Sequence, residues 1–390
     1  MEEAGRKILS AAYALAGKVL APEPLGHAAV VVRDGRIESI VRSQRAEDLP
    51  FEIREVGGYI CPGFVDLQIN GSFGVDVGPD YKGLAKLSRL LPETGTTAFL
   101  PTLISSPKDR YAAFLDAVEK ASRSGGASIP GAHLEGPFLS SARKGAHDPG
   151  NLRDVDLGLI EEWVDSGLVR LVTLAPELPG ATEAIGRLRE GGVLASAGHT
   201  DASCEEMVGA ADAGLASGTH LYNAMSPLSH RAPGAVGALL DDRRVRAGII
   251  ADGIHVHEAA LRIAYRQKGA EGLFLVTDAM EAAGMEPGEY ELNGRRVRLE
   301  DGAVRLEDGT LAGSALTMDR AVRNARELLR CGLEDAVRMA TRTPAQALGL
   351  ENKGRISPGA NADLTVLDEE GAVQQTIVAG RTVYEREGSP

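Results

Sequence analysis

The middle of the chain alternates short apolar runs with stretches of helical periodicity. Eight apolar runs follow one another in this way: 64–67, 96–100, 129–134, 169–174, 193–195, 216–220, 245–250 and 273–276. After Pro107, four apolar side chains have the i, i+3, i+4, i+7 spacing of an amphipathic helix: Tyr111, Phe114, Leu115 and Val118. Strands that alternate with helices are typical of a parallel sheet. Eight such units predict an α/β fold, a (β/α)8 barrel whose chemistry lies at the carboxyl ends of its strands.

The two ends of the chain have a different pattern, in which short apolar stretches alternate with turns. Four such stretches occur: 29–32, 37–40, 362–367 and 376–384. The first two flank Asp34-Gly35 and the last two flank a turn at 369–371, as in antiparallel hairpins. We expect the apolar segment 8–17 to be a first strand rather than an export signal, because two glutamates make its start acidic.

The two β-rich ends are expected to form one small domain. Residues 1–60 and 352–390 together predict a discontinuous β-sandwich domain. Residues 61–351 between them predict the (β/α)8 barrel.

The composition of the chain limits the partners that it is expected to bind and the compartment in which it is expected. The chain has 42 Lys and Arg against 55 Asp and Glu, and the resulting net charge of −13 repels nucleic acids and anionic membranes. No run of eighteen apolar residues is present, so no membrane-spanning helix is expected. The cysteines Cys61, Cys204 and Cys331 are widely spaced and form no CxxC motif, which favours a reducing cytoplasm over a disulfide framework.

Candidate chemistry gathers at the predicted strand ends. Six of the eight histidines end or follow a strand: His133, His147, His199, His220, His255 and His257. Glu135 ends the third run, His199 follows the fifth and His220 ends the sixth. In one barrel these side chains converge on the axis as a His2Glu set that leaves a divalent metal, zinc first, an open coordination position. Taken alone, each of the three is more readily a buried or capping residue without a ligand, and the alternative loses ground only when all three are considered together.

Asp278 ends the eighth run and projects toward the same mouth. A carboxylate there is placed to accept a proton from an activated water. The alternative is a cap for the following helix.

Several motifs along the chain resemble those of the N-acetylglucosamine-6-phosphate deacetylases, a family of the amidohydrolase superfamily. They are PGFVD (62–66), HLEGPF (133–138), KGAH (144–147), AGHT (197–200), THLYNAM (219–225), HRAPG (230–234), IADGIH (250–255), VTD (276–278) and LAGSALTM (311–318). The resemblance covers nearly the whole chain, because GRISPGANAD at 354–363 resembles the superfamily's return to its small β domain.

The resemblance implies hydrolysis of an N-acetylated amino-sugar 6-phosphate to the free amine and acetate. It implies that Glu135, His199 and His220 are the metal ligands. It makes Asp278 the catalytic acid and base, and it places His147 beside the amide carbonyl. The implied substrate contacts are Gly136, Asn223, Ala224, Arg231 and His255. Arg231 would reach into the neighbouring subunit's site in a homodimer.

The side chains at the end of the first predicted strand indicate how many metal ions to expect. Many amidohydrolases have His-x-His there and bind a second metal, whereas Gln68 and Asn70 resemble the corresponding positions in this chain. Neutral amides are poor ligands for a divalent transition metal, so one ion per subunit is expected, with iron, cobalt or manganese as alternatives to zinc.

Three other functions stay open. The first is the same reaction on another N-acetylhexosamine 6-phosphate, such as the galactosamine epimer, because one hydroxyl is distinguished only by pocket contacts. The second is hydrolysis of a cyclic amide, which the missing His-x-His disfavours. The third is an inactive relative that binds sugar phosphates, although such proteins usually lose a ligand or the proton carrier, and this chain keeps all four.

Overall fold

The computed structural model describes residues 12–21, 23–42 and 50–387, and its centre is an eight-stranded parallel sheet. Its strands are β5 (Phe64–Ile69), β8 (Thr96–Ile104), β9 (Ala132–Glu135), β10 (Val169–Leu174), β11 (Leu194–Ala197), β12 (Ser217–Gly218), β13 (Arg246–Ile249) and β14 (Leu273–Leu275). The Asp278 N–H donates to Gln68 O at 3.0 Å, which joins the end of the last unit to the first strand. The predicted (β/α)8 barrel is confirmed.

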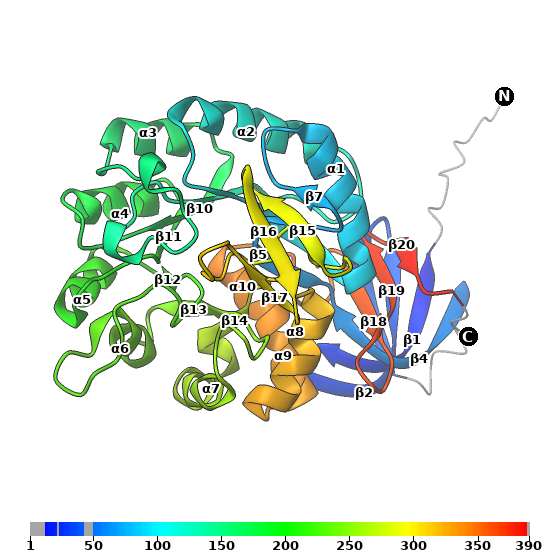
Figure 1. Ribbon diagram of the computed structural model, residues 1–390. Helices are drawn as coiled ribbons and strands as arrows, with labels where there is room; N and C mark the ends of the chain where they lie inside the picture. The colour runs from blue at the N-terminus through cyan, green and yellow to red at the C-terminus, as the bar shows by residue number, and fades with distance from the viewer. Residues whose placement is uncertain (1–11, 22, 43–49, 388–390) are drawn as a thin grey trace.

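Helices surround this sheet on its outer side (Figure 1). They are α1 (Tyr81–Leu90), α2 (Lys108–Ala121), α3 (Leu157–Asp165), α4 (Ala181–Glu190), α5 (Cys204–Ala213), α6 (Gly234–Asp241), α7 (Glu258–Gly272), α8 (Met318–Asn324), α9 (Leu333–Ala340) and α10 (Arg342–Ala347). Short 3-10 helices are η2 (Leu91–Thr94), η3 (Ser141–Arg143) and η4 (Pro149–Asn151), and η5 (Ala325–Leu329) is a π-helical segment. The predicted amphipathic helix is α2, which buries Tyr111 and Phe114. Because α2 and its neighbours bury such apolar faces against the strands, the barrel has a continuous core.

The two ends of the chain meet in one seven-stranded mixed sheet, ordered β20-β19-β18-β4-β1-β2-β3. Its strands are β1 (Tyr13–Ala21), β2 (Glu23–Arg33), β3 (Arg36–Arg42), β4 (Glu52–Pro62), β18 (Leu364–Leu367), β19 (Val373–Val378) and β20 (Arg381–Glu385). β4 pairs with β1 on one side and β18 on the other, which brings the ends together. The Asp34-Gly35 hairpin is confirmed, and both residues have the positive φ that a type I′ turn needs.

Two strands expected at the ends of the chain differ from the structure or are covered by it only in part. The apolar stretch 376–384 is not one strand, because the positive φ angles of Ala379 and Gly380 turn the chain between β19 and β20. The predicted first strand at 8–17 is covered only in part, since residues 8–11 lie outside the described residues and β1 begins at Tyr13.

The small sheet curls so that its edge strand β3 approaches the segment that leads into β18. The Ile37 N–H donates to Ala360 O and the Ala362 N–H to Gly35 O, both at 2.9 Å. A separate apolar cluster that includes Ile37 lies inside the curl, as in a sandwich. The exact domain boundaries stay a prediction, because only Gly63 separates β4 from β5.

A three-stranded sheet, which the sequence analysis did not predict, covers the carboxyl ends of β8 and β14. It consists of β15 (Gly288–Leu292), β16 (Arg295–Glu300) and β17 (Ala303–Arg305), and we call it the cap sheet. Its apolar side packs on Ile104 and Met280, which follow or end those barrel strands. Figure 1 shows it in yellow across the barrel. A separate short hairpin is formed by β6 (Gly71–Ser72) and β7 (Val75–Asp76).

Candidate metal centre

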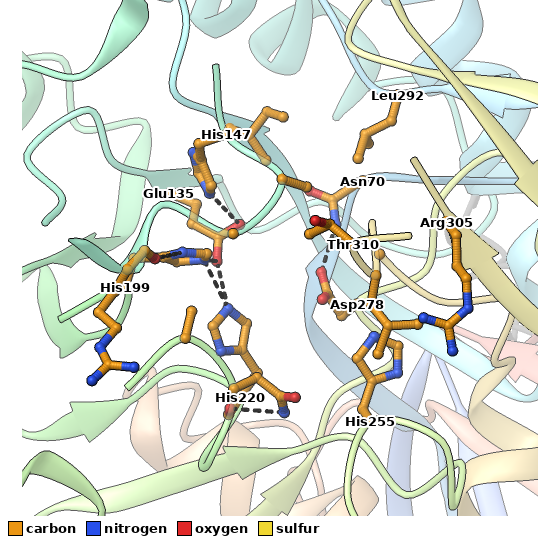
Figure 2. A pocket seen from close by; sticks show the side chains of 18 of the residues that line it. Asn70, Glu135, His147, His199, His220, His255, Asp278, Leu292, Arg305 and Thr310 are labelled. Atoms are coloured by element: carbon orange, nitrogen blue, oxygen red, sulfur yellow. Dashed lines mark hydrogen bonds and ion pairs between the residues drawn. The ribbon is translucent and has the colours of Figure 1, made fainter. Parts of the chain in front are cut away.

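Side chains from three barrel strands, β9, β11 and β12, meet at the carboxyl ends of those strands. Glu135 ends β9, and His199 and His220 each follow a strand end by two residues. The His220 Nε2 lies 3.0 Å from Glu135 Oε1 and 3.1 Å from His199 Nε2, and all three candidate ligand atoms lie within 4.8 Å of one another. Figure 2 shows the three side chains turned toward one another. The predicted ligand set therefore converges.

The backbone at these positions is held in an unusual conformation. His199, His220 and Asp278 all have positive φ angles, at 48°, 33° and 48°. Residues with a Cβ rarely adopt this region, and where they do the surrounding structure must hold them there. The turns after the strands are thus shaped to aim these side chains inward.

The donor set fits a divalent transition metal. The His199 Nδ1 lies 2.9 Å from the Arg143 carbonyl oxygen, so Nδ1 carries the proton and Nε2 presents a lone pair to the centre. Burial would raise the pKa of Glu135, but hydrogen bonds and charge from His199 and His220 outweigh it and hold that pKa well below its usual range. A buried carboxylate between two imidazoles is stabilised by a cation bound among the three side chains, and three protein ligands leave a coordination position open.

Gln68 and Asn70 are directed at carboxylates. The Gln68 amide donates to Glu135 Oε1 at 3.0 Å, and the Asn70 amide donates to Asp278 Oδ1 at 2.7 Å. Both amides therefore orient acidic side chains of the site, which supports the expectation of a single metal ion.

Asp278 lies across the cavity from His147 and His199 (Figure 2). Burial raises its pKa to about 6, and the negative charge of Glu135 adds to the shift. A carboxyl group with a pKa close to neutrality can both accept and return a proton. This placement favours the catalytic interpretation over the helix cap.

His147 is buried, with 2% of its surface exposed, so it is not an exposed loop histidine. Its Nδ1 accepts a hydrogen bond from the Ser105 N–H at 3.3 Å, and its Nε2 lies 3.8 Å from Glu135 Oε2. Burial lowers the pKa of His147 to about 3, and the neighbouring His199 lowers it further. The ring is therefore neutral, with its proton on Nε2 at the edge of the cavity.

A cavity of about 510 Å³ contains this centre, a size suited to a small ligand. Eight of the sequence-predicted site residues line it: Glu135, His147, His199, His220, Asn223, Ala224, His255 and Asp278. Gly136 is buried in the turn behind Glu135, and Arg231 is exposed in the loop before α6, so neither lines this cavity. The lining residues that sequence reasoning missed include Arg143, Leu292, Arg305 and Thr310.

The three cysteines and the tryptophan have no more than structural roles. Cys61, Cys204 and Cys331 are free. Trp163 is buried between the rings of Tyr111 and Phe138, whose centroids lie 5.2 and 5.6 Å away. In the described ranges, none of the helices combines the length and apolarity that crossing a membrane requires.

Comparison with known proteins finds a matching family model and similar N-acetylhexosamine-6-phosphate deacetylases over most of the chain. A family model described as "Amidohydrolase family" matches residues 59–383. An N-acetylglucosamine-6-phosphate deacetylase from Lysinibacillus sphaericus is 39% identical over 361 residues, which cover 90% of this chain and 92% of the relative. An N-acetylgalactosamine-6-phosphate deacetylase from Shewanella sp. (strain ANA-3) is 40% identical over 372 residues, 93% of each chain. The structure of a Mycobacterium smegmatis N-acetyl-D-glucosamine-6-phosphate deacetylase mutant in complex with N-acetyl-D-glucosamine-6-phosphate superposes with a TM-score of 0.89, 35% identity, and coverage of 96% of this chain and 99% of that one.

Proposed function

The chain belongs to the amidohydrolase family, and we propose that it hydrolyses N-acetyl-D-glucosamine 6-phosphate to D-glucosamine 6-phosphate and acetate. The observation that carries this proposal is the convergence of Glu135, His199 and His220 beside Asp278 in one cavity. Acetate release from the metal-loaded protein tests it. Folded, metal-loaded protein that releases no acetate from this substrate would refute the assignment.

The chain's own side chains supply the proton transfers that an acetamide needs. The amide is unreactive because its carbonyl is a weak electrophile and its nitrogen leaves poorly as an anion. A divalent cation held by Glu135, His199 and His220 would lower the pKa of a water molecule and stabilise negative charge on oxygen. Asp278 accepts a proton from the attacking water and returns it to the departing nitrogen, so the amine leaves neutral. The Nε2–H of His147 donates a hydrogen bond to the carbonyl oxygen, where negative charge develops, and keeps its proton.

We propose zinc as the resident ion, with iron, cobalt or manganese as the alternatives. Two imidazoles and one carboxylate form a ligand set typical of catalytic zinc, although the same donors accept those other metals. Elemental analysis of the protein purified without added metal distinguishes them.

The homodimer and the cytoplasmic location also belong to the proposal. Arg231 is exposed and outside its own subunit's cavity, which leaves it available to a neighbouring subunit. Sedimentation velocity tests the dimer. Three free cysteines are compatible with a reducing compartment.

The galactosamine epimer is a second candidate substrate, because the relative from Shewanella named for that substrate is as similar to the chain as the one named for the glucosamine substrate. The two sugars differ in one hydroxyl, and the pocket discriminates them by the partner that this hydroxyl finds. Comparing kcat/KM for the two 6-phosphates decides between them, and we expect the glucosamine epimer to be preferred.

Replacing His147 with glutamine is expected to lower kcat about 10²-fold while metal content stays at the wild-type level. The variant loses the Nε2 donor at the carbonyl oxygen but keeps a polar side chain in the buried position. Steady-state kinetics together with elemental analysis measures both quantities. His257→Gln is a matched control, because His257 is exposed at the start of α7 and should leave kcat unchanged. An unchanged kcat in His147→Gln would remove His147 from the reaction.

Replacing Asn70 with alanine is expected to move the acidic limb of the kcat profile to higher pH. The Asn70 amide donates to Asp278 and so lowers the pKa of that carboxyl group. Without this hydrogen bond the pKa of Asp278 rises, and a higher pH is needed to ionise the base. A hydrogen bond worth roughly 1 kcal/mol predicts a displacement of roughly 0.7 pH units. A limb that stays in place or moves to lower pH would contradict the role of Asp278 as base.

A further inference from the structure

One fully buried acidic side chain of the barrel has no part in the mechanism described above. Asp66 lies on β5 two residues before Gln68, so the two side chains point to the same face of the strand. Its surface is 0% exposed, and burial raises its pKa to about 7. Among the described residues, no basic side chain forms an ion pair with it. A buried carboxylate without a cation destabilises a fold, so the fold alone does not account for an aspartate here.

Three hydrogen bonds attach the Asp66 carboxylate to both ends of the barrel sheet. Its Oδ1 accepts from the Gln68 N–H at 3.2 Å and from the Thr277 N–H at 3.3 Å. Its Oδ2 accepts from the Thr277 hydroxyl at 2.6 Å. Gln68 belongs to β5, the first strand, and Thr277 follows the end of β14, the last strand, by two residues. Asp66 therefore joins the first strand to the turn that follows the last one.

This turn contains Asp278, whose backbone has the strained φ of 48°. Such a conformation persists only where the surrounding structure holds it. The Thr277 hydroxyl also accepts from the Ala279 N–H at 3.2 Å, so its hydrogen bonds span the turn on both sides of Asp278. Ser314 holds the turn from another segment, because its N–H donates to the Asp278 carbonyl at 2.7 Å and its hydroxyl to the Thr277 carbonyl at 2.6 Å. Asp66 is thus the side chain that ties the turn to β5.

The direction of the Asp278 carboxylate depends on the conformation of this turn. The Asn70 amide contacts one of its oxygens, Oδ1, at 2.7 Å (Figure 2). Proton transfer requires the carboxylate to lie within hydrogen-bond distance of the reacting atoms, and a displacement of about 1 Å can lower a rate about 10²-fold. The three metal-ligand candidates belong to other strands, so a change in this turn leaves them in place.

We propose that Asp66 is a positioning residue of the proposed reaction: through Thr277 it holds the strained turn that directs Asp278 toward the metal centre. This inference rests on the proposed function, and it extends the reaction's requirements to a side chain that does not line the cavity. The direction of Asp278 matters for proton transfer rather than for substrate binding. The effect of losing this connection therefore falls on kcat and leaves KM nearly unchanged.

Thr277→Val tests this role, because valine has the shape of threonine but lacks the hydroxyl that joins Asp66 to the turn. We expect kcat for acetate release from N-acetylglucosamine 6-phosphate to fall about 10- to 100-fold, while KM stays within about threefold. The metal content should equal that of wild type. Thr277→Ser keeps the hydroxyl, so its kcat should lie within about threefold of the wild-type value.

Asp66→Ala removes the same connection from the other side and is expected to lower kcat to a similar extent. The double variant Asp66→Ala, Thr277→Val should be no slower than the slower single variant, because the two side chains act through one contact. Losses of kcat that multiply in the double variant would show that the two residues act separately, which would refute the proposal.

Thr376→Val is the matched control for a loss of stability. Thr376 is a fully buried threonine of β19 whose hydroxyl donates to the Pro92 carbonyl at 2.7 Å, outside the cavity. We expect both valine variants to melt at a lower temperature than wild type, but only Thr277→Val to lose kcat. An unchanged kcat in Thr277→Val, or an equal loss of kcat in both variants, would overturn the positioning role. Loss of metal from Thr277→Val would show instead that Asp66 supports the metal centre.

Crystal structures of wild type and Thr277→Val separate this inference from the proposed reaction, because they need no turnover. If metal-loaded wild type released no acetate, the proposed reaction would fail, while the position of Asp278 in the two structures would still decide the role of Asp66. We expect the Asp278 carboxylate of the variant to move by about 1 Å and to lose its hydrogen bond from Asn70. An Asp278 that keeps its wild-type position and φ would refute the proposal.

Discussion

Asp278→Asn is expected to lower kcat about 10³-fold, within the range that general acid and base catalysis contributes. The amide of asparagine preserves the shape of the side chain and its hydrogen bond with Asn70, but it cannot accept the proton of the attacking water or return one to the amine. Since the three metal-ligand candidates are untouched, the metal content should equal that of wild type. Acetate release and elemental analysis on the same preparation measure both quantities.

The control for this substitution is Asp116→Asn, which removes an exposed carboxylate on α2 that pairs with Lys120. Its kcat should equal the wild-type value. Wild-type turnover in Asp278→Asn would exclude Asp278 as the proton carrier. A large loss of metal from the variant would mean that Asp278 acts mainly as a ligand.

Glu135→Gln is expected to abolish metal binding and to lower activity at least about 10³-fold. Loss of the metal removes several kcal/mol of transition-state stabilisation, and about 1.36 kcal/mol corresponds to a tenfold change in rate. Glu135 is the negatively charged member of the three metal-ligand candidates, and it contacts the imidazoles of His199 and His220. Added metal should stabilise wild type by about 2.7 kcal/mol at a hundredfold excess over Kd, and it should leave the melting temperature of the variant unchanged.

The same experiment separates loss of the metal from loss of the fold. Glutamine has the size of the glutamate it replaces and leaves no buried charge, so the metal-free variant should melt within a few degrees of metal-free wild type. A variant that still gains stability from added metal would contradict the assignment of Glu135 as a ligand.

The barrel and the metal-ligand candidates could be predicted from sequence because both depend on local patterns. Alternating apolar runs and helices determine where the strand ends lie, and parallel strands bring those ends to one mouth. Glu135, His199 and His220 were recognised at such ends without any contact being known, and the structure places their side chains together. The proton position on His199 could not be predicted, because the Arg143 carbonyl that fixes it lies 56 residues away in sequence.

The cap sheet was missed although its turns were visible in the sequence. Asn293-Gly294 and Asp301-Gly302 are strong hairpin signals, and all four residues have positive φ. Apolar residues alternate on either side of these turns, as at Val297 and Leu299. The sequence does not show in which direction the hairpins fold. Arg305 lies at the mouth of the barrel because the cap sheet packs on Met280 and its neighbours, which are distant in sequence.

The most direct test of the central claim is an anomalous-difference map from crystals of the protein loaded with one equivalent of zinc, recorded at the zinc edge. The account predicts a single strong peak per subunit, within bonding distance of Glu135, His199 Nε2 and His220 Nε2, and facing Asp278. A peak at another position, or no peak among these three side chains while the metal is bound stoichiometrically, would contradict it.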